Sequence, residues 1–136
     1  MTQRLALFSL VVRDYDEAIA YFTGALGFEL LEDTPLGDGK RWVRVAPSSG
    51  GAELLLARAR SAAQSDRIGD QHGGRVGFFL HTDDFAGEYA RMQQAGVQFV
   101  ESPRNEPYGR VVVFTDLYGN RWDLVEIKAT ERRHDL

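Results

Sequence analysis

The 136-residue chain contains no cysteine, which excludes disulfide bonds, zinc–thiolate sites, iron–sulfur clusters and a thiol nucleophile. It has only three histidines, His72, His81 and His134, and therefore few imidazole groups for a metal ion. Acidic residues outnumber basic ones by 20 to 16, giving a formal net charge of −4. A nucleic-acid backbone requires a basic surface, so we expect no nucleic-acid partner.

Long apolar runs are also missing. The first apolar stretch ends at Arg13 and Asp14, and it is too short for a signal peptide or for a membrane span of about 20 residues. We therefore expect a cytoplasmic protein that does not associate with a membrane. Hydrophobic residues still make up 43% of the chain, which is typical of a globular protein of one domain, here residues 1–136.

The sequence repeats one pattern of acid and glycine. Asp14 follows an apolar, strand-like run and is suited to cap a helix, which Gly27 would end. Asp83 and Asp84 offer the N-cap of a second helix, which Gly96 would end, and Asp83 precedes Gly96 by the same 13 positions. Each predicted helix is followed by three short β-rich segments separated by turn residues. The order β-α-β-β-β therefore occurs twice.

This repeat predicts an α+β fold made of two tandem β-α-β-β-β modules. The modules span residues 5–57 and 75–127. Residues 58–74 are polar and rich in small side chains, which indicates a linker, with a short helix near 62–68. Residues 128–136 form a polar tail without apolar periodicity.

Three segments carry a family resemblance. They are residues 11–30 (VVRDYDEAIAYFTGALGFEL), 78–99 (FFLHTDDFAGEYARMQQAGVQF) and 116–126 (DLYGNRWDLVE). With the RWVRV and PYGRVVVF segments, the chain resembles the vicinal oxygen chelate superfamily over residues 5–127. That superfamily includes glyoxalase I, bleomycin-resistance proteins and extradiol dioxygenases. The resemblance implies curled mixed sheets that form a ligand-holding cup, and a homodimer.

The resemblance also implies where a divalent metal would bind. In the metal-using members, four His, Glu or Gln ligands come from the first and last strands of each module. These positions fall on Leu7, Glu53, Gly77 and Asp123 here. Leucine and glycine have no donor atom, so Glu53 and Asp123 remain as weak metal candidates. We expect no metal cofactor, and a divalent metal is the alternative.

The same two carboxylates are candidates for other chemistry. Glu53 and Asp123 are suited to transfer protons or to bind a cationic ligand. The alternative is that each pairs with an arginine, such as Arg41, Arg75, Arg110 or Arg121. His81 lies four residues after Gly77 on the same predicted strand, so the two should face the same side of the sheet. Its imidazole has a suitable intrinsic pKa for proton transfer, and His81 is the third catalytic candidate. The alternative for His81 is a structural role.

Four aromatic residues are candidates to line a ligand site: Trp42, Phe79, Tyr108 and Phe114. Aromatic side chains in strands also form ordinary core, which is the alternative for this set. Trp122 precedes Asp123 directly, so the two side chains should face opposite sides of the sheet.

Three function classes follow. The first, which we favour, is a protein that binds a small organic ligand in a cup without a complete metal site. The second is a metal-dependent lyase or dioxygenase of the same superfamily. The third is an enzyme that transfers protons with Glu53, Asp123 or His81. The sequence leaves open whether the protein is an enzyme.

Overall fold

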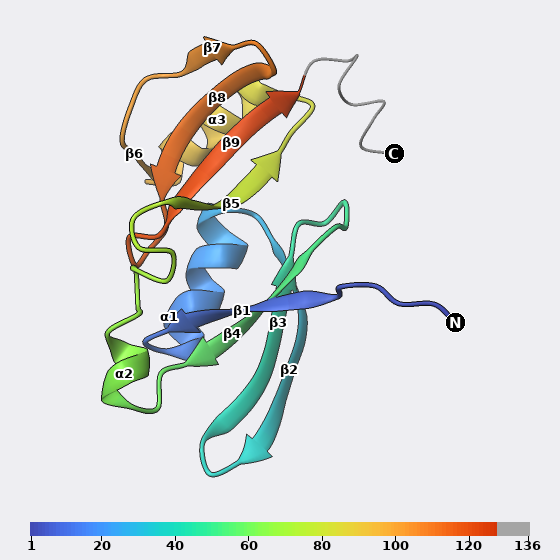
Figure 1. Cartoon of the computed structure of the whole chain (residues 1–136), viewed down its shortest axis with the longest axis vertical. Helices are drawn as coiled ribbons and strands as arrows, with labels where there is room; N and C mark the ends of the chain where they lie inside the picture. Colours follow the sequence, from blue (N-terminus) through green and yellow to red (C-terminus); the bar gives the residue numbers. More distant parts are fainter. Residues whose placement is uncertain (128–136) are drawn as a thin grey trace. The chain divides into compact units, whose positions relative to one another are not determined.

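The computed structural model describes residues 1–127, and the predicted polar tail lies outside the described residues. The chain divides into two compact units, Met1–Gln71 and His72–Leu136. Each unit contains one sheet with a helix packed on it (Figure 1). The α+β fold predicted from the repeat is confirmed. None of the helices in residues 1–127 is long and apolar enough to cross a membrane.

The first unit builds a four-stranded sheet in the order β1-β4-β3-β2. Its strands are β1 (Leu7–Val12), β2 (Glu29–Gly37), β3 (Lys40–Ala46) and β4 (Glu53–Arg58). Its helical segments are α1 (Tyr15–Ala20), the π-helical turn η1 (Tyr21–Ala25) and α2 (Ala62–Ser65). Asp14 caps α1 as predicted, because its carboxylate accepts the Glu17 N–H at 2.8 Å.

The second unit repeats this arrangement in the order β5-β9-β8-β6, with β7 paired to β8. Its strands are β5 (Val76–His81), β6 (Gln98–Phe99), β7 (Arg104–Glu106), β8 (Gly109–Thr115) and β9 (Arg121–Ile127). Its helix is α3 (Phe85–Gln94), capped by Asp84, the second of the two aspartates predicted for this place. In both units the first strand runs parallel to the last strand, and the last strand is antiparallel to its other neighbour.

The helix-facing side of each sheet forms the hydrophobic core. In the first unit, Val43, Val45 and Leu56 are fully buried together with Ala18 and Phe22 of the helical segments. In the second unit, an aromatic series joins the sheet to α3: Phe78, Trp122, Phe114, Phe99 and Tyr89, each ring 4.5–5.9 Å from the next. The opposite side of the second sheet is not uniformly exposed: it holds the buried Val113, Asp123 and Val125 beside the exposed Phe79 and His81.

Two segments rich in turn residues form more strand than their composition indicates. In residues 35–39 (PLGDG), β2 continues to Gly37 and only Asp38 and Gly39 turn, at φ angles of 53° and 77°. Asp-Gly is the preferred pair for a two-residue hairpin with positive φ at both positions, and Pro35 is tolerated because β2 is an edge strand. In residues 102–109 (SPRNEPYG), which contain two prolines, Arg104–Glu106 pairs with β8 as β7.

Candidate functional site

The carboxylate of Glu53 lies on the side of the first sheet that faces away from α1. Its Cα partner across β1 is Leu7, so the two positions implied for a metal in this unit are direct neighbours. Arg44 on β3 donates to Glu53 Oε1 at 2.5 Å and to Glu32 Oε1 at 3.0 Å. Arg44 thus lies between two carboxylates, one from β2 and one from β4.

The ion-pair cluster of Glu32, Arg44 and Glu53 shifts the pKa values of Glu32 and Arg44. Hydrogen bonding to Arg44, with a smaller contribution from Thr34, lowers the pKa of Glu32 below its ordinary value. Hydrogen bonding to Glu32 and then Glu53 raises the pKa of Arg44. Glu53 is therefore paired with an arginine, which was the alternative given for it, but the partner is Arg44 and not one of the four arginines named from the sequence. Alternation along the RWVRV segment, which puts Arg44 on the same side as Trp42, was the signal that would have identified it.

In the second unit, the implied metal position at Gly77 is occupied by a neighbouring imidazole. Gly77 lies at a register irregularity between Val76 and Phe78 in the pairing of β5 with β9. A Cβ atom at Gly77 would overlap the His72 ring. His72, which the sequence assigned to the linker, reaches this place because Gly73 and Gly74 adopt positive φ angles of 64° and 90°. The Arg75 N–H closes this turn onto the His72 carbonyl at 3.3 Å.

The second carboxylate candidate, Asp123, differs from Glu53 in its surroundings. It lies on β9 opposite Phe79 of β5 and Val113 of β8, on the side of the sheet away from α3. Only 7% of Asp123 is exposed, and its Oδ1 has no hydrogen-bond partner among residues 1–127. Burial raises the pKa of Asp123, the charge of Glu101 adds to this, and the charge of Arg104 opposes it.

Arg104 is the cation whose charge acts on Asp123, but its guanidinium forms ion pairs with other carboxylates. Its guanidinium contacts Glu101 Oε2 at 3.2 Å and Glu106 Oε1 at 2.7 Å. Hydrogen bonding to Glu106, and then to Tyr108, raises its pKa. Glu101 also accepts the Val113 N–H at 3.0 Å, which fixes this carboxylate at the edge of β8. The sequence did not indicate this role of Glu101, because the role depends on β6 ending at Phe99, two residues before Glu101.

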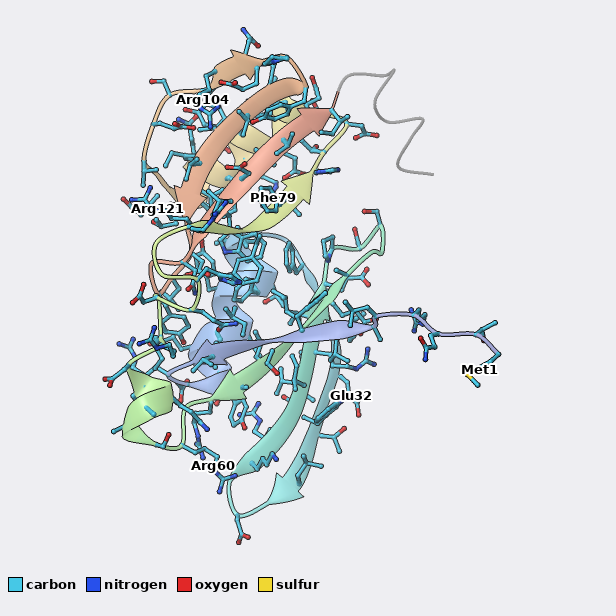
Figure 2. The ribbon with its side chains drawn as sticks, viewed as in Figure 1. Met1, Glu32, Arg60, Phe79, Arg104 and Arg121 are labelled. Carbon is cyan, nitrogen blue, oxygen red and sulfur yellow. The ribbon has the colours of Figure 1, made fainter. Side chains whose placement is uncertain are left out.

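The remaining candidates lie in different surroundings. Phe79 is 62% exposed on β5 (Figure 2), and Tyr108 is partly exposed and bonded to Arg104. His81 is exposed at the end of β5 and opposite Val125. Trp42 is half-buried beside Thr34 in the first unit. Phe114 is fully buried in the core against α3, so it does not share a side of the sheet with Phe79.

The residues present do not fit a metal ion. Two of the four implied positions, Leu7 and Gly77, lack a donor atom. The third, Glu53, is bonded to Arg44, and the fourth is the buried carboxyl group of Asp123. Within residues 1–127, no group of three or more His, Asp or Glu side chains is arranged to hold a metal.

Comparison with known proteins identifies the family. The profile of the Glyoxalase/Bleomycin resistance protein/Dioxygenase superfamily matches residues 4–124. The chain belongs to this superfamily. An uncharacterised relative in Shewanella frigidimarina is 52% identical over 129 residues, covering 93% of this chain and 96% of the relative.

Members of this superfamily with solved structures share the fold. The structure of UcmS2 is 32% identical, covers 92% of this chain and 98% of its own, and gives a TM-score of 0.78. The structure of TnmS3, described as an antibiotic binding protein from Streptomyces sp. CB03234, is also 32% identical. It covers 93% of this chain and 98% of its own, with a TM-score of 0.75.

Proposed function

We propose that this protein binds a small organic molecule without a metal ion and so sequesters it. The observation that carries the proposal is the lack of available metal donors at three of the four positions that hold the metal in metal-using members of the superfamily. Leu7 and Gly77 offer no donor atom, and Glu53 is bonded to Arg44 at 2.5 Å. An arginine that already neutralises a carboxylate must be displaced before that carboxylate can bind a cation, which opposes metal binding.

The antibiotic-binding relative supports an organic ligand. TnmS3 is 32% identical over nearly the whole chain, and its description names a binding function. In this protein, the sheet side away from α3 combines an exposed aromatic ring at Phe79 with a buried carboxyl group at Asp123. Organic ligands are usually held by apolar and aromatic surface with a few directed polar groups.

The expected assembly and location complete the proposal. We propose that the protein works as a homodimer in the cytoplasm, where it would meet a small molecule that has entered the cell. Light scattering coupled to size-exclusion chromatography tests the dimer. A mass of one chain at micromolar concentration would contradict it.

A thermal-shift screen in EDTA tests metal-free binding. The panel should contain bleomycin, acridone, 9-aminoacridine and an anthraquinone sulfonate, each added in large excess. We expect at least one compound to raise the melting temperature by about 3 °C, because a ligand that binds only the folded state stabilises it. No shift with any compound, or shifts that require added metal, would contradict the proposal.

A further inference from the structure

We propose that Phe79 and Asp123 form a binding subsite for a planar aromatic ligand that carries a positively charged nitrogen. The inference rests on the proposed function and adds the chemical class of the ligand. The two residues are Cα partners on the adjacent parallel strands β5 and β9. Such neighbours lie about 4.8 Å apart and point to the same side of a sheet.

The first observation is a missing partner at Asp123. Only 7% of the residue is exposed, and its Oδ1 accepts no hydrogen bond from residues 1–127. Buried polar atoms in folded proteins nearly always have a hydrogen-bond partner, and an unpaired one is costly. A ligand N–H directed at Oδ1 would satisfy this atom.

The second observation is the distribution of charge around Asp123. Arg104 is bonded to both Glu101 and Glu106, so two carboxylates already balance its single positive charge. The charge of Arg104 favours the ionised form of Asp123 and that of Glu101 opposes it. Within residues 1–127, Arg104 is bonded to Glu101 and Glu106 and not to Asp123, whereas Glu53 has a direct ion pair with Arg44. A cationic nitrogen supplies such an ion pair, whereas a ligand carboxylate would add a further negative charge.

The third observation is the exposed ring next to the carboxyl group. Phe79 is 62% exposed, whereas its neighbour Phe78 stacks on Trp122 at 4.5 Å in the core. An exposed phenyl face can stack on a planar ligand, and it also attracts a cation. The combination of a ring and an adjacent carboxyl group selects an aromatic cation over an aliphatic amine or a neutral ring.

Two dyes of equal ring size and different charge test the inference. 9-Aminoacridine is cationic at neutral pH, and acridone is neutral. Calorimetric titration of both dyes into the full-length protein, with EDTA present, should show at least about tenfold tighter binding of 9-aminoacridine. Asp123→Asn should remove that preference, and Phe79→Ala should weaken both dyes. Asp38→Asn, in the hairpin turn of the first unit, is the matched carboxylate control and should change neither affinity.

The outcomes separate this inference from the proposed function. Equal affinity of the unmodified protein for the two dyes overturns the inference and leaves small-molecule binding intact. This comparison does not depend on the folding of any variant. A preference that survives Asp123→Asn in folded protein also overturns it. If Phe79→Ala changes the oligomeric state and not dye affinity, Phe79 belongs to a protein interface and the inference fails. If neither dye nor any compound of the screen binds, the proposed function fails as well.

Discussion

Two carboxylates in equivalent places of the two units have different surroundings. Glu53 and Asp123 each lie on the strand that runs parallel to the first strand of its unit, opposite Leu7 and Phe79 respectively. Glu53 is bonded to Arg44, whereas Asp123 is buried with an unpaired Oδ1. A buried charge without a partner destabilises the folded state. Asp123 is therefore a residue whose presence costs stability.

Asp123→Asn should stabilise the protein in a pH-dependent way. The folded pKa of Asp123 is raised above its ordinary value of 3.8, so the proton is held more tightly in the folded state than in the unfolded state. The resulting stabilisation is present below pH 3.8 and is lost as pH rises through the folded pKa. We expect the variant to be more stable by about 1 kcal/mol at neutral pH, with the difference vanishing in acid. Urea unfolding at a series of pH values measures this.

A variant that is less stable at neutral pH would show that Asp123 is already satisfied in the folded protein. A gain in stability together with weaker binding of 9-aminoacridine would mark Asp123 as a residue kept for binding. Functional sites commonly carry such a cost in stability.

Gly77 and His72 form a second residue-scale pair. A methyl group at Gly77 would overlap the His72 ring, which also makes an edge-on contact with Phe78 at 5.1 Å. Gly77→Ala should destabilise the protein by about 1 kcal/mol and displace the imidazole. In the His72→Ala background the same change should cost less, because the overlapping ring is gone. Chemical unfolding of the unmodified protein, the two single variants and the double variant measures the energies, and NMR chemical shifts report on the His72 ring. Additive changes in the free energy of unfolding, with unchanged His72 signals, would contradict this prediction.

At the scale of single elements, the turn between β8 and β9 is organised by one carboxylate. Asp116 is 5% exposed, and its Oδ1 accepts the N–H groups of Tyr118, Gly119 and Asn120 at 3.0–3.1 Å. Its Oδ2 accepts from Asn120 Nδ2 at 3.1 Å and from Trp122 Nε1 at 3.0 Å. The D-x-x-G-N sequence therefore anchors this turn to the core through the indole.

Asp116→Ala should lower the free energy of unfolding by about 3 kcal/mol, because it leaves several buried donors without an acceptor. Asp116→Asn retains one acceptor oxygen and should cost less. Chemical denaturation of both variants measures the difference. Equal stability of the alanine variant and the unmodified protein would contradict the account of this turn.

The exposed edge of β1 is closed by a side chain from the linker. β1 is an edge strand, and the Gln71 amide accepts the Val11 N–H at 2.9 Å and donates to the Ser9 carbonyl at 2.8 Å. The side-chain amide thus replaces part of a neighbouring strand. An edge strand with open N–H and C=O groups invites pairing with another chain.

Gln71→Ala should expose the Val11 amide and cost about 1 kcal/mol. Hydrogen exchange of Val11 should become faster. Gln71→Glu, which keeps the acceptor but not the donor, should protect Val11 better than the alanine variant. Unchanged exchange at Val11 in Gln71→Ala would show that the amide contributes nothing to the edge.

At the scale of the whole molecule, the sequence predicted the repeat but not the contacts that finish each site. The Asp14 cap and the placement of Glu53 and Phe79 followed from local residue types and from strand alternation. Arg44 was predictable by the same alternation. The overlap of His72 with Gly77 was not, because it depends on the path of the Gly73–Gly74 turn, and the unpaired Oδ1 of Asp123 depends on packing from three strands.

We propose that this superfamily member binds an organic molecule without a metal ion. The most direct test measures metal content and binding on one preparation, before and after EDTA treatment. We predict well below one Zn, Ni, Mn or Fe atom per chain, and the same affinity for 9-aminoacridine within about twofold after chelation and after metal is added back. About one tightly held metal per chain, with binding or turnover that disappears on chelation and returns with the metal, would contradict the account.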